Sequence, residues 1–431
     1  MPAALVCISP AESHVGPVLT LVRALTGQGW RVRVLTGARF AGRIRAAGAD
    51  PLPLPPEGDV LDNAEDDDGP RGIRALNQAL GRYFIRPAPP QFAAMREALA
   101  DEPCDVVVTD PTFMGSLLLP TLPDRPPLVM ASFFPMAVSS ADTAPFGLGV
   151  KPWPGALGRV RNRLLTVVAR RVVLARVHRD LDTFLLSHGL RGLEGRFMSD
   201  AIMAVAQPRL FAQFTVPAFE YPRSDLPDNV RFYGPLRPQP PLGLARPDWW
   251  SRLDTADPIV LVSQGTVANA DFDELIVPTL AALATDPVTV IATLGRADRR
   301  QVGSLGQVPS NTVVTDFVPY ADLMPRVAVF VTNGGYGGVQ EALAHGVPMV
   351  VAGDTQDKVE VSARIAWSGV GINLRTGHPT PAAIGRAVRK VLADGRYRQA
   401  SGAIAQQIAA APGTDAFVAD LERIAAEPRS N

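Results

Sequence analysis

The chain has 431 residues, too many for one ordinary hydrophobic core and suited to two domains of roughly 200 residues each. Apolar residues make up 47% of the chain and charged residues 19%, which indicates a globular protein and excludes extensive disorder. Lys plus Arg and Asp plus Glu both number 42, so no net charge draws the chain to nucleic acid or to an anionic membrane over long range. Nucleic-acid partners are therefore disfavoured.

The cysteine and amino-terminal patterns predict a cytoplasmic protein. The two cysteines, Cys7 and Cys104, each lie beside an apolar run, and a single pair so far apart is a poor disulfide framework. The run from Ala3 to Ser9 is broken at once by Pro10, so we expect no secretion signal. The stretch from Leu164 to Val177 is interrupted by arginines and is shorter than the roughly 20 apolar residues that cross a bilayer, so we expect no membrane span.

Short β-branched runs alternate with helical patterns in the first half of the chain. Strands are predicted at Leu5–Ser9, Arg31–Thr36, Val106–Thr109 and Leu128–Ala131, and helices at Val15–Leu25, Phe40–Ala47 and Ala156–His188. The third and fourth strands are apolar throughout, as in a parallel sheet covered by helices on both faces. This order predicts a Rossmann-like α/β domain over residues 1–236, with a proline-rich, aromatic insertion from Phe133 to Pro154.

A proline-rich stretch separates this half from a second alternation. Gly234 to Pro247 carries five prolines and cannot sustain a helix or a central strand, so we place a linker at residues 237–247. Strands are predicted after it at Ile259–Ser263, Val288–Thr293, Val313–Thr315, Val329–Thr332 and Pro348–Val351. Residues 248–431 therefore form a second Rossmann-like domain, and a helix predicted at Ala416–Ala426 packs on one domain or the other.

The most informative segment runs from a strand through a glycine cluster directly into a helix. Gly334, Gly335, Gly337 and Gly338 fill four of five successive positions. A helix amino terminus exposes unpaired N–H groups and the positive end of the helix dipole, and glycines let an anionic diphosphate approach them closely. A tight strand-to-helix turn is the alternative use of such glycines, but their density here favours a diphosphate site.

Polar residues near other strand ends extend this site. Glu341, in the first two turns of the helix, can accept hydrogen bonds from ribose hydroxyls or merely complement the helix dipole. Asp357 comes soon after the last predicted strand and is the natural partner for sugar hydroxyls. Gly265 and Thr266 follow the strand that ends at Ser263 and can donate hydrogen bonds to the same diphosphate.

These segments resemble the donor signature of family 1 glycosyltransferases, the UDP-glycosyltransferase and antibiotic macrolide glycosyltransferase group. The similar stretches are Asp316–Tyr320, Thr332–Pro348, Asp357–Lys358 and Ala363–Ile365, together with an opening βαβ unit at His14–Leu25, Gly29–Thr36 and Ala46–Gly48. The resemblance spans both halves and is weakest between about residues 57 and 226. It implies the GT-B fold, in which two Rossmann-like domains face an interdomain cleft.

The resemblance also implies roles for individual donor-site residues. Phe317 stacks on the nucleotide base where relatives commonly have tryptophan, and Val318 holds the base through its backbone. Glu341 binds the ribose, while Asn333, Gly337 and Gly338 line the diphosphate and Asp357 and Lys358 meet the sugar. Asn333 stands where many relatives have histidine and Lys358 where glutamine is common, so the donor's identity stays open between UDP- and dTDP-sugars.

His14 and Asp110 are the candidate catalytic pair. We expect His14 in the loop after the first strand, at the carboxyl edge that faces the cleft. A histidine with an ordinary pKa near 6.5 suits a general base that deprotonates an acceptor hydroxyl, and helix capping is the alternative. Asp110 directly follows the strand at Val106–Thr109 and matches the family's His-Asp dyad, in which a carboxylate fixes the imidazole tautomer; the alternative is a helix cap before Pro111.

The predicted reaction is a single displacement that inverts the anomeric carbon. A hexose leaves its UDP or dTDP carrier for a hydroxyl group of a small, largely apolar natural product such as a polyketide, macrolide or flavonoid. No metal ion is needed, since the glycine-rich helix end, Thr266 and Asn333 meet the charge on the leaving group. The acidic run Glu65–Asp68 is assigned no chemistry. Candidate acceptor contacts are the aromatic residues Phe84, Phe113, Phe133 and Phe134, and the chain is expected to be a monomer or homodimer.

Two other functions stay open. A nucleotide-sugar epimerase on the same scaffold would need acid and base groups around the sugar ring, whereas His14 and Asp110 lie on the acceptor side. A nucleotide-sugar-binding relative that lost the reaction would bind donor without turnover. A dinucleotide-dependent dehydrogenase is set aside, because Pro10–Gly16 lacks the required glycine spacing.

Overall fold

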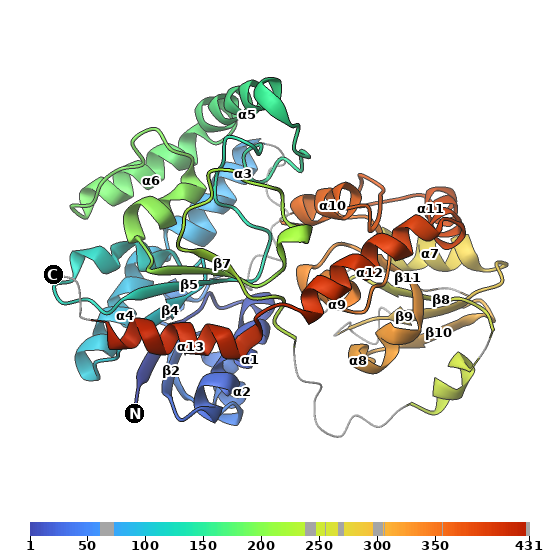
Figure 1. Cartoon of the computed structure of the whole chain (residues 1–431), viewed down its shortest axis with the longest axis horizontal. Coiled ribbons are helices and arrows are strands. Elements are labelled where there is room, and N and C mark those ends of the chain that lie inside the picture. Colours follow the sequence, from blue (N-terminus) through green and yellow to red (C-terminus); the bar gives the residue numbers. More distant parts are fainter. Residues whose placement is uncertain are drawn as a thin grey trace.

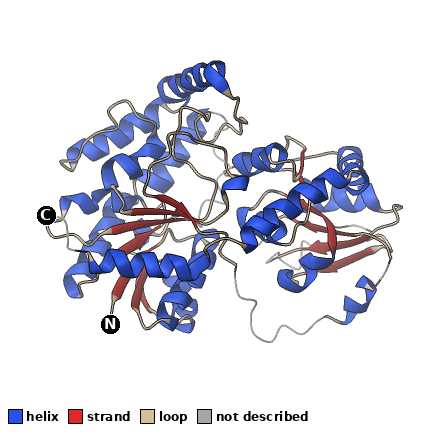
Figure 2. Cartoon of the chain, viewed as in Figure 1, coloured by secondary structure: helices blue, strands red, loops and turns tan. Residues whose placement is uncertain are grey.

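Two separate parallel β-sheets, each with helices on both faces, make up the protein (Figure 1, Figure 2). The computed structural model describes residues 1–60, 73–237, 247–254, 256–265, 271–295, 305, 307–355 and 357–427. Within these ranges each sheet draws its strands from one side only of the proline-rich stretch. This is the GT-B architecture, and the α/β fold class expected from the sequence is confirmed.

The amino-terminal sheet has seven parallel strands in the order β3-β2-β1-β4-β5-β6-β7. They are β1 (Ala3–Cys7), β2 (Arg31–Thr36), β3 (Asp50–Pro53), β4 (Val106–Thr109), β5 (Leu128–Ser132), β6 (Leu210–Gln213) and β7 (Val230–Phe232). Its helices are α1 (Glu12–Gly27), α2 (Ala41–Ala46), α3 (Ile73–Leu80), α4 (Ala88–Asp101), α5 (Gly155–Val168) and α6 (Ala175–Ser187). Strands β2 and β3 are added on one side of β1 and strands β4 to β7 on the other. Because β1 and β4 are parallel neighbours, their carboxyl ends lie side by side.

The carboxy-terminal sheet has six parallel strands in the order β10-β9-β8-β11-β12-β13. They are β8 (Ile259–Ser263), β9 (Thr289–Thr293), β10 (Thr312–Thr315), β11 (Val327–Thr332), β12 (Met349–Val351) and β13 (Gly371–Asn373). The helices of this half are α7 (Ile276–Leu283), α8 (Tyr320–Leu323), α9 (Tyr336–Ala344), α10 (Lys358–Trp367), α11 (Pro381–Ala393) and α12 (Gly395–Ala409), and the last helix of the chain is α13 (Gly413–Ala426). Here the order reverses at β8, next to β11 and its glycine cluster.

Each sheet buries apolar side chains on both faces, because alternate strand residues point to opposite sides. In β1, for example, Leu5 and Cys7 belong to one hydrophobic core and Ala4 and Val6 to the other. The last helix, α13, belongs to the amino-terminal half: Phe417, Val418, Leu421 and Ile424 join the core that contains α1. In Figure 1 this red helix crosses below the amino-terminal sheet, on the half of the protein that contains β1.

Three short edge strands were not predicted. β3 reads Asp-Pro-Leu-Pro, and prolines are tolerated there because β3 is the outermost strand of its sheet. β7 and β13 have three residues each, too few to leave a periodic pattern. No helix in the described part of the chain is both long enough and apolar enough to cross a bilayer.

Candidate active site

His14 and Asp110 meet where β1 and β4 end side by side. The Nδ1 atom of His14 lies 3.5 Å from Oδ1 of Asp110 and 3.3 Å from Oγ1 of Thr112. His14 is not in a loop, as expected from the sequence, but in the first turn of α1, which begins at Glu12. The helix starts earlier than expected because the backbone N–H groups of His14 and Val15 both donate hydrogen bonds to the Ala11 carbonyl, which forms the first helical turn.

Asp110 is fully buried and surrounded by donors. Its carboxylate accepts hydrogen bonds from the backbone N–H of Ser9 at 2.7 Å, Thr112 at 2.7 Å and Phe113 at 3.1 Å, and also from the Thr112 hydroxyl. Burial favours the neutral acid, but His14 and these hydrogen bonds outweigh it and hold the pKa of Asp110 below its ordinary value. An ionised carboxylate therefore faces the imidazole, and the same group also caps the turn after Pro111.

Two phenylalanines from the long loop after β5 pack against the imidazole. The ring centroid of Phe133 lies 5.6 Å from that of His14, edge to face, and the ring of Phe134 lies at 6.1 Å. Phe133 is buried and Phe134 half-buried. Of the aromatic residues predicted to meet an acceptor, these two are beside the candidate base.

The other two predicted acceptor residues lie elsewhere. Phe113 is fully buried in the amino-terminal hydrophobic core, so its prediction as an acceptor contact is wrong for this structure. Its apolar side chain packs in the same core as Leu5 and Val107, on one face of the sheet. Phe84 is partly buried and packs against the same core.

The glycine cluster forms the predicted strand-to-helix turn between β11 and α9. Gly334 has a φ of +88°, a left-handed conformation that glycine adopts without strain. Asn333 is buried; its side chain donates to the Gln264 carbonyl and accepts from the Gly335 N–H at 3.2 Å. Gly335 is the residue that precedes the first turn of α9. Asn333 therefore links the ends of β8 and β11 and orients the helix amino terminus.

Gly337 has no packing reason to be glycine. A Cβ atom at this exposed position would meet nothing within 4 Å, whereas one at Gly338 would contact the Phe330 ring at 3.5 Å. Gly337 lies in the first turn of α9, where backbone N–H groups are unpaired. Its bare backbone suits an anion that approaches the helix end closely.

The residues predicted to hold the nucleoside lie around α9 and after β10. Phe317 is 51% exposed, so its ring is open to a stacking partner, while Val318 is buried. The Glu341 carboxylate already has two neighbours: the His345 ring at 3.1 Å and the Arg237 guanidinium at 3.5 Å. Neither partner was predicted, and Arg237 is 104 positions from Glu341 in the sequence.

The sugar end of the site lies at the start of α10. Asp357 directly precedes the helix and Lys358 is its first residue, and both are partly buried. Burial raises the pKa of Asp357, opposed by the charges of Lys358 and His14. Asp357 therefore lies close enough to His14, on the other half of the protein, for a positive charge on the imidazole to lower the pKa of the Asp357 carboxyl. Gly265, with a φ of +89°, follows β8, and Thr266 lies outside the described residues, as does the acidic run at 65–68.

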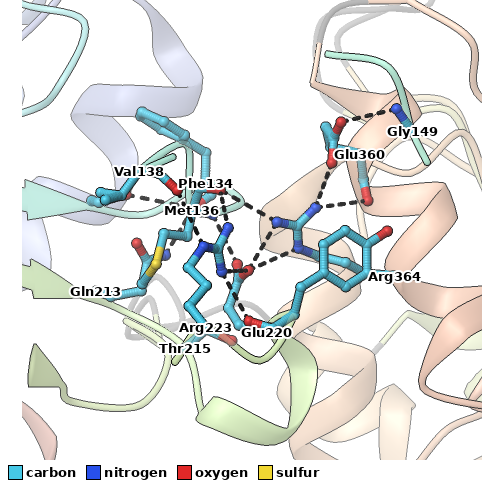
Figure 3. A network of polar contacts seen from close by, with 12 residues as sticks. Phe134, Met136, Val138, Gly149, Gln213, Thr215, Glu220, Arg223, Glu360 and Arg364 are labelled. Carbon is cyan, nitrogen blue, oxygen red and sulfur yellow. Dashed lines mark hydrogen bonds and ion pairs between the residues drawn. The ribbon is translucent and has the colours of Figure 1, made fainter. Parts of the chain in front are cut away.

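A buried ion network just beyond this site was missed by the sequence analysis (Figure 3). Arg364 of α10 is 1% exposed and contacts Glu220 of the amino-terminal half at 2.9 Å and Glu360 at 2.7 Å. Burial disfavours the guanidinium charge, but Glu220 and Glu360 raise the pKa of Arg364 above its ordinary value. One signal of this buried charge was present in the sequence: Arg364 lies between the apolar residues Val361 and Ile365 of a helix.

Glu360 joins the same network to the loop that follows the phenylalanine pair. Its Oε1 atom accepts hydrogen bonds from the backbone N–H of Gly147 at 2.8 Å and of Gly149 at 2.9 Å. A small pocket lies between loop and helix; its lining includes Met136, Phe146, Tyr221, Arg223, Glu360 and Arg364. The loop is therefore anchored at one end beside His14 and at the other on the donor-side helix α10.

Comparison with known proteins identifies this architecture. Residues 278–424 match the family model described as "Erythromycin biosynthesis protein CIII-like, C-terminal domain". The chain is 38% identical over 412 residues to 4'-demethylrebeccamycin synthase of Lentzea aerocolonigenes, covering 94% of this chain and 95% of that protein. It is 32% identical over 462 residues to UDP-glycosyltransferase 2 of Phaeomoniella chlamydospora, covering 99% and 96%. The solved structure of the calicheamicin glycosyltransferase CalG4 superposes with a TM-score of 0.75 at 24% identity over 98% of both chains.

The fold and these full-length similarities define a nucleotide-sugar-dependent glycosyltransferase. The chain belongs to the family 1 glycosyltransferases, and the resemblance drawn from its sequence motifs is confirmed.

Removal of Glu220 tests the buried network. We expect Glu220→Ala to lower the free energy of unfolding by about 3–5 kcal/mol, because Arg364 and Arg223 lose a shared buried partner. Urea-unfolding curves measure the change. Arg389→Ala is the matched control: it breaks the exposed pair with Asp286 and should lower the free energy of unfolding far less, because water screens that pair. An equal decrease in the free energy of unfolding of both variants would contradict the claim that the buried pair stabilises the fold more than the exposed pair.

Asp110 predicts a pH dependence of stability. Its folded pKa lies below the unfolded value of about 3.9, so its ionisation stabilises the fold fully above about pH 5, and this contribution is lost as the pH falls through the folded pKa. We expect Asp110→Asn to be less stable than the native chain near neutral pH, with the difference narrowing below about pH 4. Urea unfolding across this range measures both chains, and a difference independent of pH would refute the assignment.

Proposed function

We propose that this glycosyltransferase moves a hexose from a UDP- or dTDP-sugar to a hydroxyl group of a small, largely apolar natural product, with inversion at the anomeric carbon. The observation that carries the proposal is the pair formed by His14 and a buried, ionised Asp110, set beside two phenylalanines and in electrostatic reach of Asp357. Residues 1–236 bind the acceptor and residues 248–431 bind the donor.

The base acts through the nitrogen that does not face Asp110. Since Nδ1 of His14 is turned towards Asp110 and Thr112, Nε2 takes the proton from the acceptor hydroxyl as its oxygen attacks the anomeric carbon. The bond from that carbon to the diphosphate oxygen breaks in the same step. Asp110 holds the imidazole orientation and stabilises the imidazolium that forms.

The donor site meets the leaving group with fixed dipoles. Gly337 and Gly338 present the amino terminus of α9 to the diphosphate. Asn333, whose side-chain oxygen accepts a hydrogen bond from the Gly335 N–H, orients that turn. Gly265 and Thr266 add donors from the end of β8. We propose that these groups make a metal ion unnecessary.

The nucleoside and sugar contacts complete the donor site. Phe317 stacks on the base, the backbone of Val318 holds its edge, and Glu341, oriented by His345 and Arg237, binds the ribose. Asp357 and Lys358 bind the sugar hydroxyls. The UDP alternative is favoured by the relative named UDP-glycosyltransferase 2, and the natural-product acceptor by the relative named 4'-demethylrebeccamycin synthase.

Loss of the base should stop the reaction but leave donor binding intact. We expect His14→Ala to lower acceptor-dependent release of nucleoside diphosphate by about 10²- to 10⁴-fold, the usual contribution of a general base. A release assay across UDP- and dTDP-sugars with phenolic and macrolide acceptors measures this, and proton NMR of the product gives the anomeric configuration. His378→Ala, at an exposed position in the carboxy-terminal half, is the control and should have native activity.

The same assay separates the competing functions. Donor conversion without any acceptor would favour an epimerase. Donor binding without turnover in the native chain, on the whole acceptor panel, would favour a binding protein. Retention of the anomeric configuration would refute the single displacement.

Two neighbouring glycines test the contact between the acceptor loop and α10. Both Gly147 and Gly149 have positive φ, +99° and +59°, but a Cβ at Gly149 would lie 2.5 Å from Val359 Cγ1 while one at Gly147 meets nothing within 4 Å. We expect Gly149→Ala to push the loop from α10 and lower kcat/KM for the acceptor by about 10- to 100-fold, without changing nucleoside-diphosphate affinity. Gly147→Ala also places a side chain at a positive φ, but without the clash, and should change kcat/KM far less. Equal effects would refute the positioning role.

A further inference from the structure

The outer helix of the amino-terminal half leaves an apolar stripe uncovered. Six large apolar side chains of α5 and the helical turn after it are between 39% and 73% exposed: Leu157, Val160, Leu164, Val167, Val168 and Val172, here called the α5 stripe. Trp153, just before the helix, is 52% exposed. More than half of the exposed large apolar side chains in the described residues therefore belong to this one segment. Scattered single exposures are ordinary, but a contiguous stripe marks an interaction surface.

The stripe is a regular helical face. Successive members are three or four residues apart, apart from the adjacent pair Val167 and Val168, so they line one side of a helix with about 3.6 residues per turn. Gly158, Asn162 and Ala169 are buried on the opposite side, which packs on the protein. In Figure 1, α5 lies at the outer edge of the amino-terminal half, and no other helix covers its far side. The stripe therefore faces away from the protein.

The stretch of sequence that contains the stripe carries basic but no acidic residues. Between Asp142 and Asp180 the sequence has no acidic residue and eight basic ones: Lys151, Arg159, Arg161, Arg163, Arg170, Arg171, Arg176 and Arg179. The whole chain, by contrast, has equal numbers of basic and acidic residues. On the helix wheel, Arg159, Arg163 and Arg170 occupy the flank between the buried face and the stripe, while Arg161 and Arg171 fall within the stripe's own angular range. Only Arg159 and Arg176 are paired with an acidic side chain in the described residues, each with one at a margin of this segment.

This combination favours an anionic surface over a second copy of the chain. Two copies that met through α5 would bring the same arginines together, and like charges oppose such contact. An amphipathic helix with an apolar face, a cationic flank and an adjacent tryptophan is instead the pattern that lies in the headgroup region of an anionic bilayer. We propose that the α5 stripe docks this glycosyltransferase reversibly on the surface of an anionic phospholipid membrane.

The docking surface connects directly to the active-site loop. The segment that begins with Phe133 and Phe134 beside His14 runs past Gly149, where it meets α10, and reaches Trp153 and α5 without an intervening strand or helix. The proposal does not depend on the assignment of His14 as the base. Its failure would leave the transferase proposal untouched, and the reverse also holds.

Vesicle flotation of the full chain tests the proposal. The probes are vesicles of phosphatidylcholine alone and of phosphatidylcholine mixed with phosphatidylglycerol. We expect the chain to float with the anionic vesicles only, and to be released by high salt, which screens the arginines. The triple variant Leu157→Ser, Val160→Ser, Leu164→Ser should reduce the floating fraction by about tenfold or more. Val308→Ser, 41% exposed in the carboxy-terminal half, is the matched control and should float like the native chain.

A charge reversal keeps the test sharp if the triple variant folds poorly. Arg163→Glu with Arg171→Glu leaves every apolar side chain in place and should also abolish flotation, while the exposed Arg386→Glu of α11 should not. Absence of flotation, or flotation that survives both stripe variants, would overturn the proposal. So would a native dimer, measured by sedimentation velocity, that dissociates in the triple variant while no vesicle is bound, because a second copy would then cover the stripe.

Discussion

A fully buried cation, Arg364, joins one half of the protein to the other. Arg364 lies on the donor-side helix α10, which directly follows Asp357. Its charge is paired with Glu220 from the amino-terminal half. A guanidinium so completely removed from water is stable only with that partner in place, because an unpaired buried charge costs several kcal/mol. The pair therefore holds α10, and with it the sugar end of the donor site, within electrostatic reach of His14.

Much of the candidate site could be predicted because it lies at strand ends. Asp110 follows β4 and Asn333 follows β11, and in a parallel α/β sheet such positions gather at one edge. The apolar strand runs, the glycine cluster and the family motifs all fix this edge locally. Local patterns did not fix the ends of helices, however: His14 was expected in a loop and lies in α1, since hydrogen bonding to Ala11 starts the helix early.

The residues that could not be predicted are those whose role depends on a partner far away in the sequence. Glu220 and Arg364 are 144 positions apart, and neither has a pattern that names the other. Phe113 shows the same limit for burial, since an aromatic residue after a strand can face the cleft or the core, and only packing decides that it joins the core. Periodicity shows which face of a helix or strand is apolar. It does not show which partner balances a charged residue on that face, because the partner comes from the other half of the protein.

Composition averages can conceal a surface that the fold creates. The balanced total charge argues against long-range attraction to an anionic membrane, yet 37 residues around α5 contain cations alone, bounded by Asp142 and Asp180. Electrostatic attraction acts within roughly 8–10 Å at physiological salt, so a surface responds to its nearest charges and not to the total. The helix also lacks the length and apolar continuity of a membrane span, and its apolar residues occupy one side only. An apolar side flanked by arginines is what a helix needs to lie along a bilayer surface.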